Sequence, residues 1–209
     1  MAPRAGLQLV QSGSLVKALA PPISKRLAGL LKVLEMSALE LGTGELILID
    51  VDQICVADWV QWKCKYGCKN YGRSWCCPPE TPTPEQARAI LKDYREAILI
   101  RNSGKSINHY RENNQKRRQQ VHGWKSTVAL ERRLFLAGYY KAFALVSESC
   151  ALCRECSYPE SCKFPMNRRP PVESFSIDVF QTLENIGMGF RIAKNVVEEH
   201  NTYSIILLD

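Results

Sequence analysis

Two spacings of hydrophobic residues alternate along the chain, one typical of helices and the other typical of strands. In residues 23–42, ISKRLAGLLKVLEMSALELG, leucines recur at three- and four-residue intervals, which predicts an amphipathic helix ending near Gly42 or Gly44. Residues 45–51, ELILIDV, form a short apolar run and predict a strand. The same spacings predict further helices at 83–97, 126–140 and 176–187, and strands at 97–101, 141–147, 189–195 and 203–209.

The helix at 83–97 has the clearest start signal. Thr83 can cap its N-terminus, Pro84 takes the first helical position, and Gln86 completes a capping box. Because helices and strands alternate several times, we expect an α/β or α+β fold in which helices flank a single mixed sheet. The pattern leaves the order and direction of the strands open.

The distribution of cysteine and charge divides the chain into two regions. Residues 1–44 contain no cysteine and no acidic residue before Glu35, and they predict a basic amphipathic helical segment. This segment is mildly similar to a transit peptide, but its few arginines favour the plain helix. Residues 45–209 hold all nine cysteines and are expected to form one cysteine-rich metal- or iron–sulfur-binding domain.

Composition points to a globular protein in a reducing compartment. The chain has 209 residues, of which 45% are hydrophobic and 23% charged, as in ordinary globular domains. It contains no run of about eighteen apolar residues and no continuous apolar signal-peptide core, so we expect no membrane span and a cytoplasmic location. In the cytoplasm, grouped cysteines serve as metal ligands or redox thiols more often than as disulfides.

A net charge of +7 permits an anionic partner without identifying one. Much of the excess lies in residues 101–133, where aromatic residues are few. A solvated helix face explains this better than a nucleic-acid site, so we do not expect nucleic-acid binding. A docking face for an acidic redox partner protein stays open as an alternative.

The second block of cysteines, CALCRECSYPESCKFP, carries the clearer chemistry. Three cysteines follow one another at two-residue gaps and a fourth comes after five more residues: Cys150, Cys153, Cys156 and Cys162. This spacing resembles the bacterial-ferredoxin run, although the last gap is longer and the proline is displaced. We therefore expect these four thiolates to hold a [4Fe–4S] cluster. Zinc is the alternative, although zinc sites usually pair two close-spaced couples.

The first block, CKYGCKNYGRSWCCPP, offers three convincing ligands, namely Cys64, Cys68 and Cys77. Cys76 is adjacent to Cys77. Adjacent cysteines point in different directions, so usually only one of them can serve a given metal ion or cluster corner. The fourth ligand is open: Cys76, Cys55, a crossing Cys162, or none. A free iron position would let the cluster bind a small anionic substrate as a Lewis acid, whereas full ligation favours electron transfer.

Other polar residues carry weaker signals. Arg168 and Arg169 follow the second block closely and can stabilise an anionic cluster, grip a carboxylate or phosphate, or remain exposed in a Pro-rich turn. His109 and His122 lie in polar segments without neighbouring ligands and are interpreted as surface residues. The chain contains no dinucleotide-binding, P-loop, nucleophile-elbow or zinc-protease motif, and Tyr71 interrupts the radical-SAM cysteine spacing.

The chain resembles a family of small cysteine-rich proteins of unknown function from bacteria and archaea, described as predicted metal-binding proteins. The resemblance rests on five segments across roughly residues 45–209: WVQWKCKYGCKNYGRSWCCPP, DYREAILI, LERRLFLAGYYKAFAL, CALCRECSYPESCKFP and RRPPVESFSIDVFQTLENIG. In that family the residue before the Cys-Pro-Pro cysteine need not be cysteine, which favours Cys77 over Cys76 as a ligand. The resemblance implies metal or cluster binding and supplies no reaction.

From these features we expect an iron–sulfur protein with one or two [4Fe–4S] clusters. It would act in electron transfer, or in redox chemistry at an open iron site, as an oxidoreductase or as the electron-transfer subunit of one. A redox protein is the expected partner. The alternative is a zinc-binding structural module that docks a protein or nucleic-acid partner.

Overall fold

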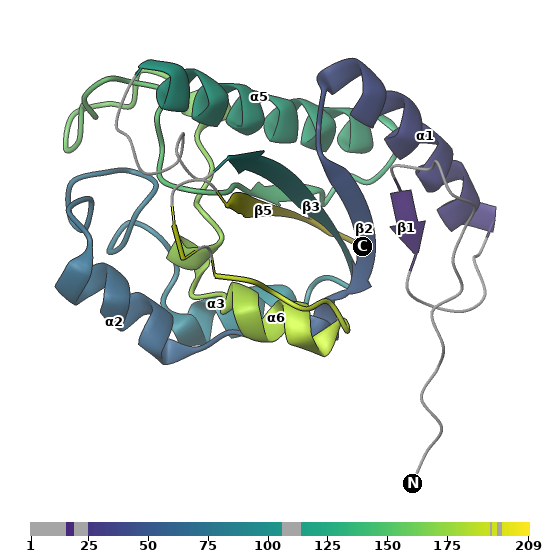
Figure 1. Ribbon diagram of the computed structural model, residues 1–209, viewed down its shortest axis with the longest axis horizontal. Coiled ribbons are helices and arrows are strands. Elements are labelled where there is room, and N and C mark those ends of the chain that lie inside the picture. Colours follow the sequence, from purple (N-terminus) through teal and green to yellow (C-terminus); the bar gives the residue numbers. More distant parts are fainter. Residues whose placement is uncertain (1–15, 19–24, 106–113, 193, 196–197) are drawn as a thin grey trace, which may run out of the picture.

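A five-stranded mixed sheet forms the centre of the protein (Figure 1). The computed structural model describes residues 16–18, 25–105, 114–192, 194–195 and 198–209. The sheet has the strand order β1-β2-β3-β5-β4. Its strands are β1 (Val16–Ala18), β2 (Glu45–Asp50), β3 (Glu96–Lys105), β4 (Phe143–Leu145) and β5 (Glu199–Leu208). β1 pairs with β2 in parallel and all other pairs are antiparallel, so the prediction of a single mixed sheet in an α+β fold is confirmed.

Helices cover both faces of this sheet. The structure contains α1 (Lys25–Leu41), α2 (Asp58–Gly67), α3 (Pro84–Leu91), α5 (Asn114–Leu136) and α6 (Val179–Asn185). Three short 3₁₀ helices, η1 (Val51–Gln53), η2 (Pro165–Asn167) and η3 (Glu173–Phe175), lie in the connections. In Figure 1, α1 and α5 lie along one face of the sheet, and α3 and α6 lie below the other. Among the described residues, every helix is too short or too polar to cross a lipid bilayer.

Alternate residues of the strands supply two separate cores, because successive strand side chains point to opposite faces. The core under α1 and α5 contains Leu30, Leu34, Leu46, Leu48, Ile98, Ile100, Leu130, Leu134, Ile206 and Leu208. The core under α3 and α6 contains Ile47, Ile49, Ala87, Leu91, Ala97, Leu99, Leu183, Ile186, Ile205 and Leu207. Through Leu30 and Leu34, α1 therefore shares a core with the sheet that follows it.

Most predicted elements are present, with shifted ends. The capping box of α3 is confirmed: Thr83 Oγ1 accepts from the Gln86 backbone N–H at 3.3 Å, and Gln86 Oε1 accepts from the Thr83 N–H at 2.9 Å. α3 ends earlier than predicted, at Leu91, and α5 begins much earlier, at Asn114. The helix α2, which ends beside the first cysteines, was not predicted.

The predicted strand at 189–195 is wrong for the residues of that range that the structure describes, because none of them pairs with the sheet. Phe190 instead packs against Phe180 of α6, with ring centroids 4.4 Å apart. The last strand, β5, begins at Glu199. Phe190, in the apolar segment for which a strand is predicted, thus packs against α6.

Candidate metal centre

Two cysteine-bearing loops lie close together on one side of the molecule. One follows α2 and the other follows β4, and Figure 1 shows both at its left. Trp75 of the first loop donates its indole N–H to the Glu160 carbonyl of the second loop at 2.8 Å. The Trp75 and Tyr158 rings also make a T-shaped contact, with centroids 5.1 Å apart. The fold therefore joins two cysteine blocks that are far apart in the sequence.

Cys64, Cys68 and Cys77 form the first thiol group. Cys64 lies in the last turn of α2, and the Cys68 N–H that caps this helix donates to the Cys64 carbonyl at 3.2 Å. Burial, and after it the negative charges of Cys68, Cys77 and Glu173, raise the pKa of Cys64 to about 11. Burial also raises the pKa of Cys77, and hydrogen bonds from Ser74 and Ser174 partly offset this. Repulsion between thiolates favours a bound cation among them.

The second thiol group contains five cysteines rather than four. They line a cavity of about 110 Å³: Cys76, Cys150, Cys153, Cys156 and Cys162. Cys76 is only 3% exposed, and its S–H donates to the Cys150 sulfur. This hydrogen bond is the largest cause that raises the pKa of Cys76 and lowers the pKa of Cys150 to about 7. The adjacent residues Cys76 and Cys77 thus belong to different groups.

Backbone donors serve the sulfurs of this second group. The Phe164 N–H donates to Cys162 Sγ at 3.4 Å, and a backbone hydrogen bond from Leu152 helps to lower the pKa of Cys150. Such N–H···S contacts are what cluster-bound thiolates receive, because they offset negative charge on sulfur.

Cys55 joins neither group. Its backbone N–H donates to Thr182 Oγ1 at 3.0 Å, and its carbonyl accepts from the Asp178 N–H at 2.8 Å, which places it beside the start of α6. Burial raises the pKa of its thiol and so does Asp178, while Arg88 lowers it. Its side chain therefore lies in a different electrostatic environment from the other eight cysteines.

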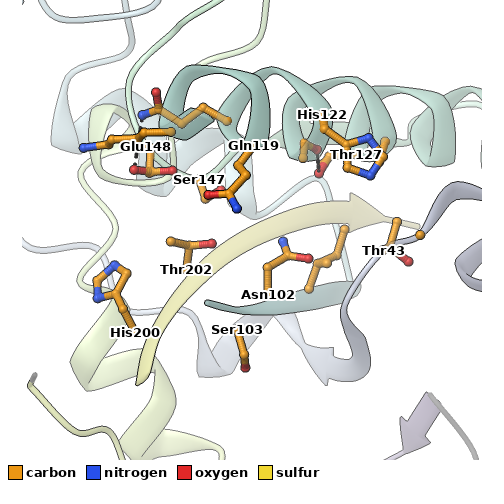
Figure 2. A pocket seen from close by; sticks show the side chains of 16 residues that line it. Thr43, Asn102, Ser103, Gln119, His122, Thr127, Ser147, Glu148, His200 and Thr202 are labelled. Atoms are coloured by element: carbon orange, nitrogen blue, oxygen red, sulfur yellow. Dashed lines mark hydrogen bonds between the residues drawn. The ribbon is translucent and has the colours of Figure 1, made fainter. Parts of the chain in front are cut away.

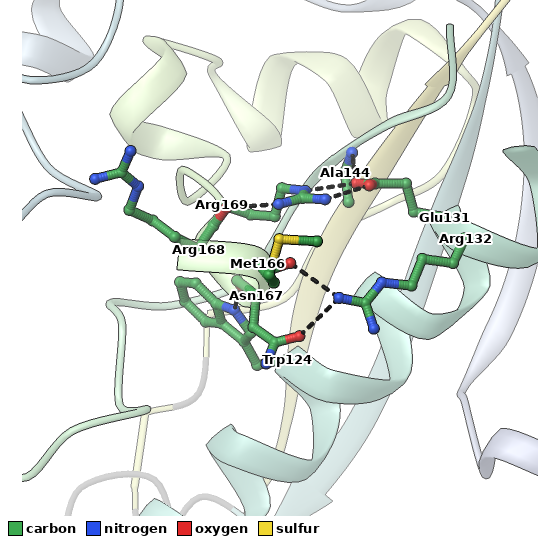
Figure 3. A network of polar contacts seen from close by, with 8 residues as sticks. All are labelled: Trp124, Glu131, Arg132, Ala144, Met166, Asn167, Arg168 and Arg169. Carbon is green, nitrogen blue, oxygen red and sulfur yellow. Dashed lines mark hydrogen bonds and ion pairs between the residues drawn. The ribbon is translucent and has the colours of Figure 1, made fainter. Parts of the chain in front are cut away.

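A polar network fixes the loop that carries the second group onto α5 and β4 (Figure 3). Glu131 of α5 forms an ion pair with Arg169 and accepts from the Arg169 Nε–H and the Ala144 backbone N–H, both at 2.7 Å. Trp124 donates to the Asn167 carbonyl at 2.7 Å. The charge of Arg169 is therefore neutralised by Glu131 and is not free to stabilise either thiol group.

The remaining polar candidates have other neighbours. The Arg168 guanidinium lies over the Trp75 ring, 5.3 Å from its centroid. His122 lines a polar cavity of about 240 Å³ between α5 and the sheet, which it shares with Asn102 and His200 (Figure 2). His109 lies outside the described residues.

The chemistry of the donors decides which metal group the site fits. In the part of the chain that the structure describes, no three His, Cys, Asp or Glu side chains are gathered as ligands of one metal ion. The thiolate ligands of a cubane cluster lie farther apart than the ligands of a single metal ion, because each thiolate binds a different iron. Groups of several thiolates suit soft metals and iron–sulfur clusters. The two all-thiol groups, with N–H donors beside the second, fit such a cluster.

A much larger cavity, of about 1310 Å³, opens beside the first thiol group. Cys64 and Cys68 line it together with Glu173 of η3. Glu173 is exposed as a residue, but surrounding protein atoms desolvate its carboxyl group and raise its pKa. Glu173 cannot be found from cysteine spacing, because it lies beside the thiols only after the chain returns from the second block.

Comparison with known proteins gives one match. No curated protein and no solved structure matches the chain. The family described as "Predicted metal-binding protein (DUF2284)" matches residues 47–208, which include all nine cysteines and every strand except β1 and part of β2. The chain belongs to this family of predicted metal-binding proteins.

Proposed function

We propose that the protein is an iron–sulfur protein that carries a [4Fe–4S] cluster at each of its two thiol groups. The observation that carries this proposal is the division of eight thiols into two sets of all-sulfur donors. In the second set Cys150, Cys153, Cys156 and Cys162 are the ligands, and Cys76 lies beside them. Such clusters supply one-electron transfer over a wide range of potentials.

The first set differs from the second in offering only three thiols, Cys64, Cys68 and Cys77. Two of these line the large cavity, and Glu173 borders it as well. A three-thiol set leaves one coordination position for an oxygen donor or a small molecule. We therefore assign electron transfer to the second site and redox chemistry on a bound molecule to the first.

Anaerobic purification tests the proposal. The expected protein is brown and contains about eight irons and about eight sulfides per chain. Cys153→Ser and Cys64→Ser should each remove about half of both, and the matched control Cys55→Ser should remove neither. A colourless protein with stoichiometric zinc and no sulfide would overturn the proposal and favour a zinc-stabilised interaction module.

A further inference from the structure

The large cavity has walls of unusual composition for a surface hollow. Six aromatic side chains from different parts of the chain line it: Trp59, Trp62, Tyr66, Phe180, Phe190 and Tyr203. They come from α2, from α6, from the segment after α6 and from β5. Pockets that bind small molecules are typically apolar and aromatic, with a few polar groups that fix orientation.

The wall formed by α2 is left open to solvent. Trp59, Trp62 and Tyr66 recur at helical spacing and share one face of this helix. Trp62 is 67% exposed and Tyr66 is 80% exposed. Soluble proteins seldom expose a continuous aromatic surface unless something binds there.

Polar groups line the part of the large cavity that adjoins a second, smaller one. Ser147, Glu148, His200 and Thr202 line both this cavity and the smaller polar cavity of Figure 2, so the two adjoin. The adjoining cavity is lined mostly by hydroxyl, amide and imidazole groups. A molecule that fills the aromatic part can therefore place a hydrogen-bonding substituent among these groups.

We propose that the large cavity binds a planar heteroaromatic small molecule with a polar side chain, held by the aromatic walls beside Cys64 and Cys68. Stacking between aromatic rings gives affinity for any flat π-system, and the polar end selects for a hydrogen-bonding substituent. This inference deepens the proposed function and rests on it in one respect: the proposed function supplies the cluster at Cys64 and Cys68 that the bound molecule would contact. The aromatic walls and the polar end do not depend on that cluster.

A concave site fits a small molecule better than a protein partner. The residues that line it include Cys64, Cys68 and Glu173 as well as the six aromatic side chains, and one small molecule in the cavity can contact both kinds of group. The cavity volume of about 1310 Å³ lies above the roughly 300–1,000 Å³ of typical ligand pockets, so space does not limit a small molecule of this class. It accommodates a fused ring system together with its side chain.

Riboflavin serves as the probe of this class, and equilibrium dialysis against the full-length protein, purified without oxygen, measures its binding. We expect saturable binding at one site, binding by lumichrome, which has the ring system alone, and no binding by ribitol, which is the side chain alone. Trp62→Ala should weaken riboflavin binding by about tenfold, since stacking on one aromatic ring contributes about that factor. The control Tyr140→Ala changes an exposed aromatic residue outside the cavity and should leave binding unchanged.

Iron and sulfide are measured on the same samples and separate the two proposals. If riboflavin does not bind to protein that carries its iron and sulfide, the cavity proposal is overturned and the cluster proposal stands. If riboflavin binds and Trp62→Ala weakens it in protein without sulfide, the cluster proposal falls and the cavity proposal stands. Binding that Trp62→Ala leaves unchanged also overturns the cavity proposal, because the α2 face would then serve another purpose, such as contact with a protein.

Discussion

Cys76 and Cys77 are consecutive in the chain, but their thiols meet different neighbours. Cys76 donates to Cys150, whereas Cys77 shares its surroundings with Cys64 and Cys68. Both are buried, at 3% and 5% exposure. The two adjacent thiols therefore lie beside different thiol groups, which a single peptide unit connects.

A paired substitution tests this division. In a Cys153→Ser background, where the second site is dismantled, we expect about four irons to remain at the first site. Adding Cys77→Ser should abolish the remaining iron, because it removes one of three thiol ligands. Adding Cys76→Ser should leave it in place. Iron and sulfide assays on anaerobic protein measure the difference, and loss of iron with Cys76→Ser would place Cys76 in the first group instead.

The thiols of the metal-free protein should differ in reactivity with pH. The pKa of Cys150 is lowered to about 7 by the Cys76 hydrogen bond, and the pKa of Cys64 is raised to about 11 by burial. Since the thiolate is the nucleophile, alkylation of Cys150 by iodoacetamide should rise as pH increases through about 7, while Cys64 stays slow until strongly alkaline pH. Mass spectrometry of the labelled peptides follows each residue.

The control for this pH profile is Cys76→Ala, which removes the hydrogen-bond donor. It should move the Cys150 profile to higher pH, because the thiolate then loses its main stabilising contact. An unchanged profile would show that another group sets the Cys150 pKa.

At the scale of elements, the sequence predicted most of the helices and strands that contribute apolar residues to the two cores. The strands at β2, β3 and β5 and the helices α1, α3 and α6 were predicted because their apolar residues follow the period of the element they form. α2 was not predicted, because its only buried residue is Val60 and its aromatic residues face the cavity. The predicted strand at 189–195 was wrong in the residues that the structure describes, for a related reason. Periodicity identifies apolar residues but does not show whether they will pack against a sheet or against a helix.

The candidate site shows the same limit. The spacing of the cysteines indicated two blocks and the residues within each block. It did not indicate that Cys76 lies with the second block or that Glu173 borders the cavity, because both depend on contacts between distant segments. Arg169 was open to three interpretations in the sequence, and its partner Glu131 lies on a helix 38 positions away.

The Glu131–Arg169 pair connects α5 to the second cysteine loop, and breaking it should loosen that connection. Their side chains are 9% and 17% exposed, so Glu131→Gln leaves a largely buried guanidinium without its counter-charge. We expect a loss of about 3 kcal/mol in the free energy of unfolding, measured by urea denaturation. The double variant Glu131→Gln with Arg169→Met should lose less than the single variant. Equal stability of Glu131→Gln and the parent protein would contradict a structural role for the pair.

On the scale of the whole molecule, the thiol groups lie outside the two large cores. Neither core contains a cysteine, and Cys76 instead packs in a smaller cluster with Trp124, Val128, Val146 and Leu152. The sheet and its helices can thus fold around their own apolar residues. The contacts of the cysteine loops include the Trp75–Glu160 hydrogen bond, the Arg117–Leu152 hydrogen bond and the Glu131 network.

This separation predicts how the protein responds to removal of its metal. Without metal, the loops at 68–82 and 150–165 lose the ligand bonds that hold their thiols together, whereas the cores keep their buried apolar contacts. After oxidative removal of the clusters in the presence of a chelator, amide hydrogen exchange in both loops should accelerate by about tenfold or more. Amides of β3 and β5 serve as the internal control and should keep their protection, since these strands share ten paired positions in the centre of the sheet.

If β3 and β5 lose protection together with the loops, the metal is required for the whole fold. If the loops exchange at the same rate with and without metal, the thiols do not hold it.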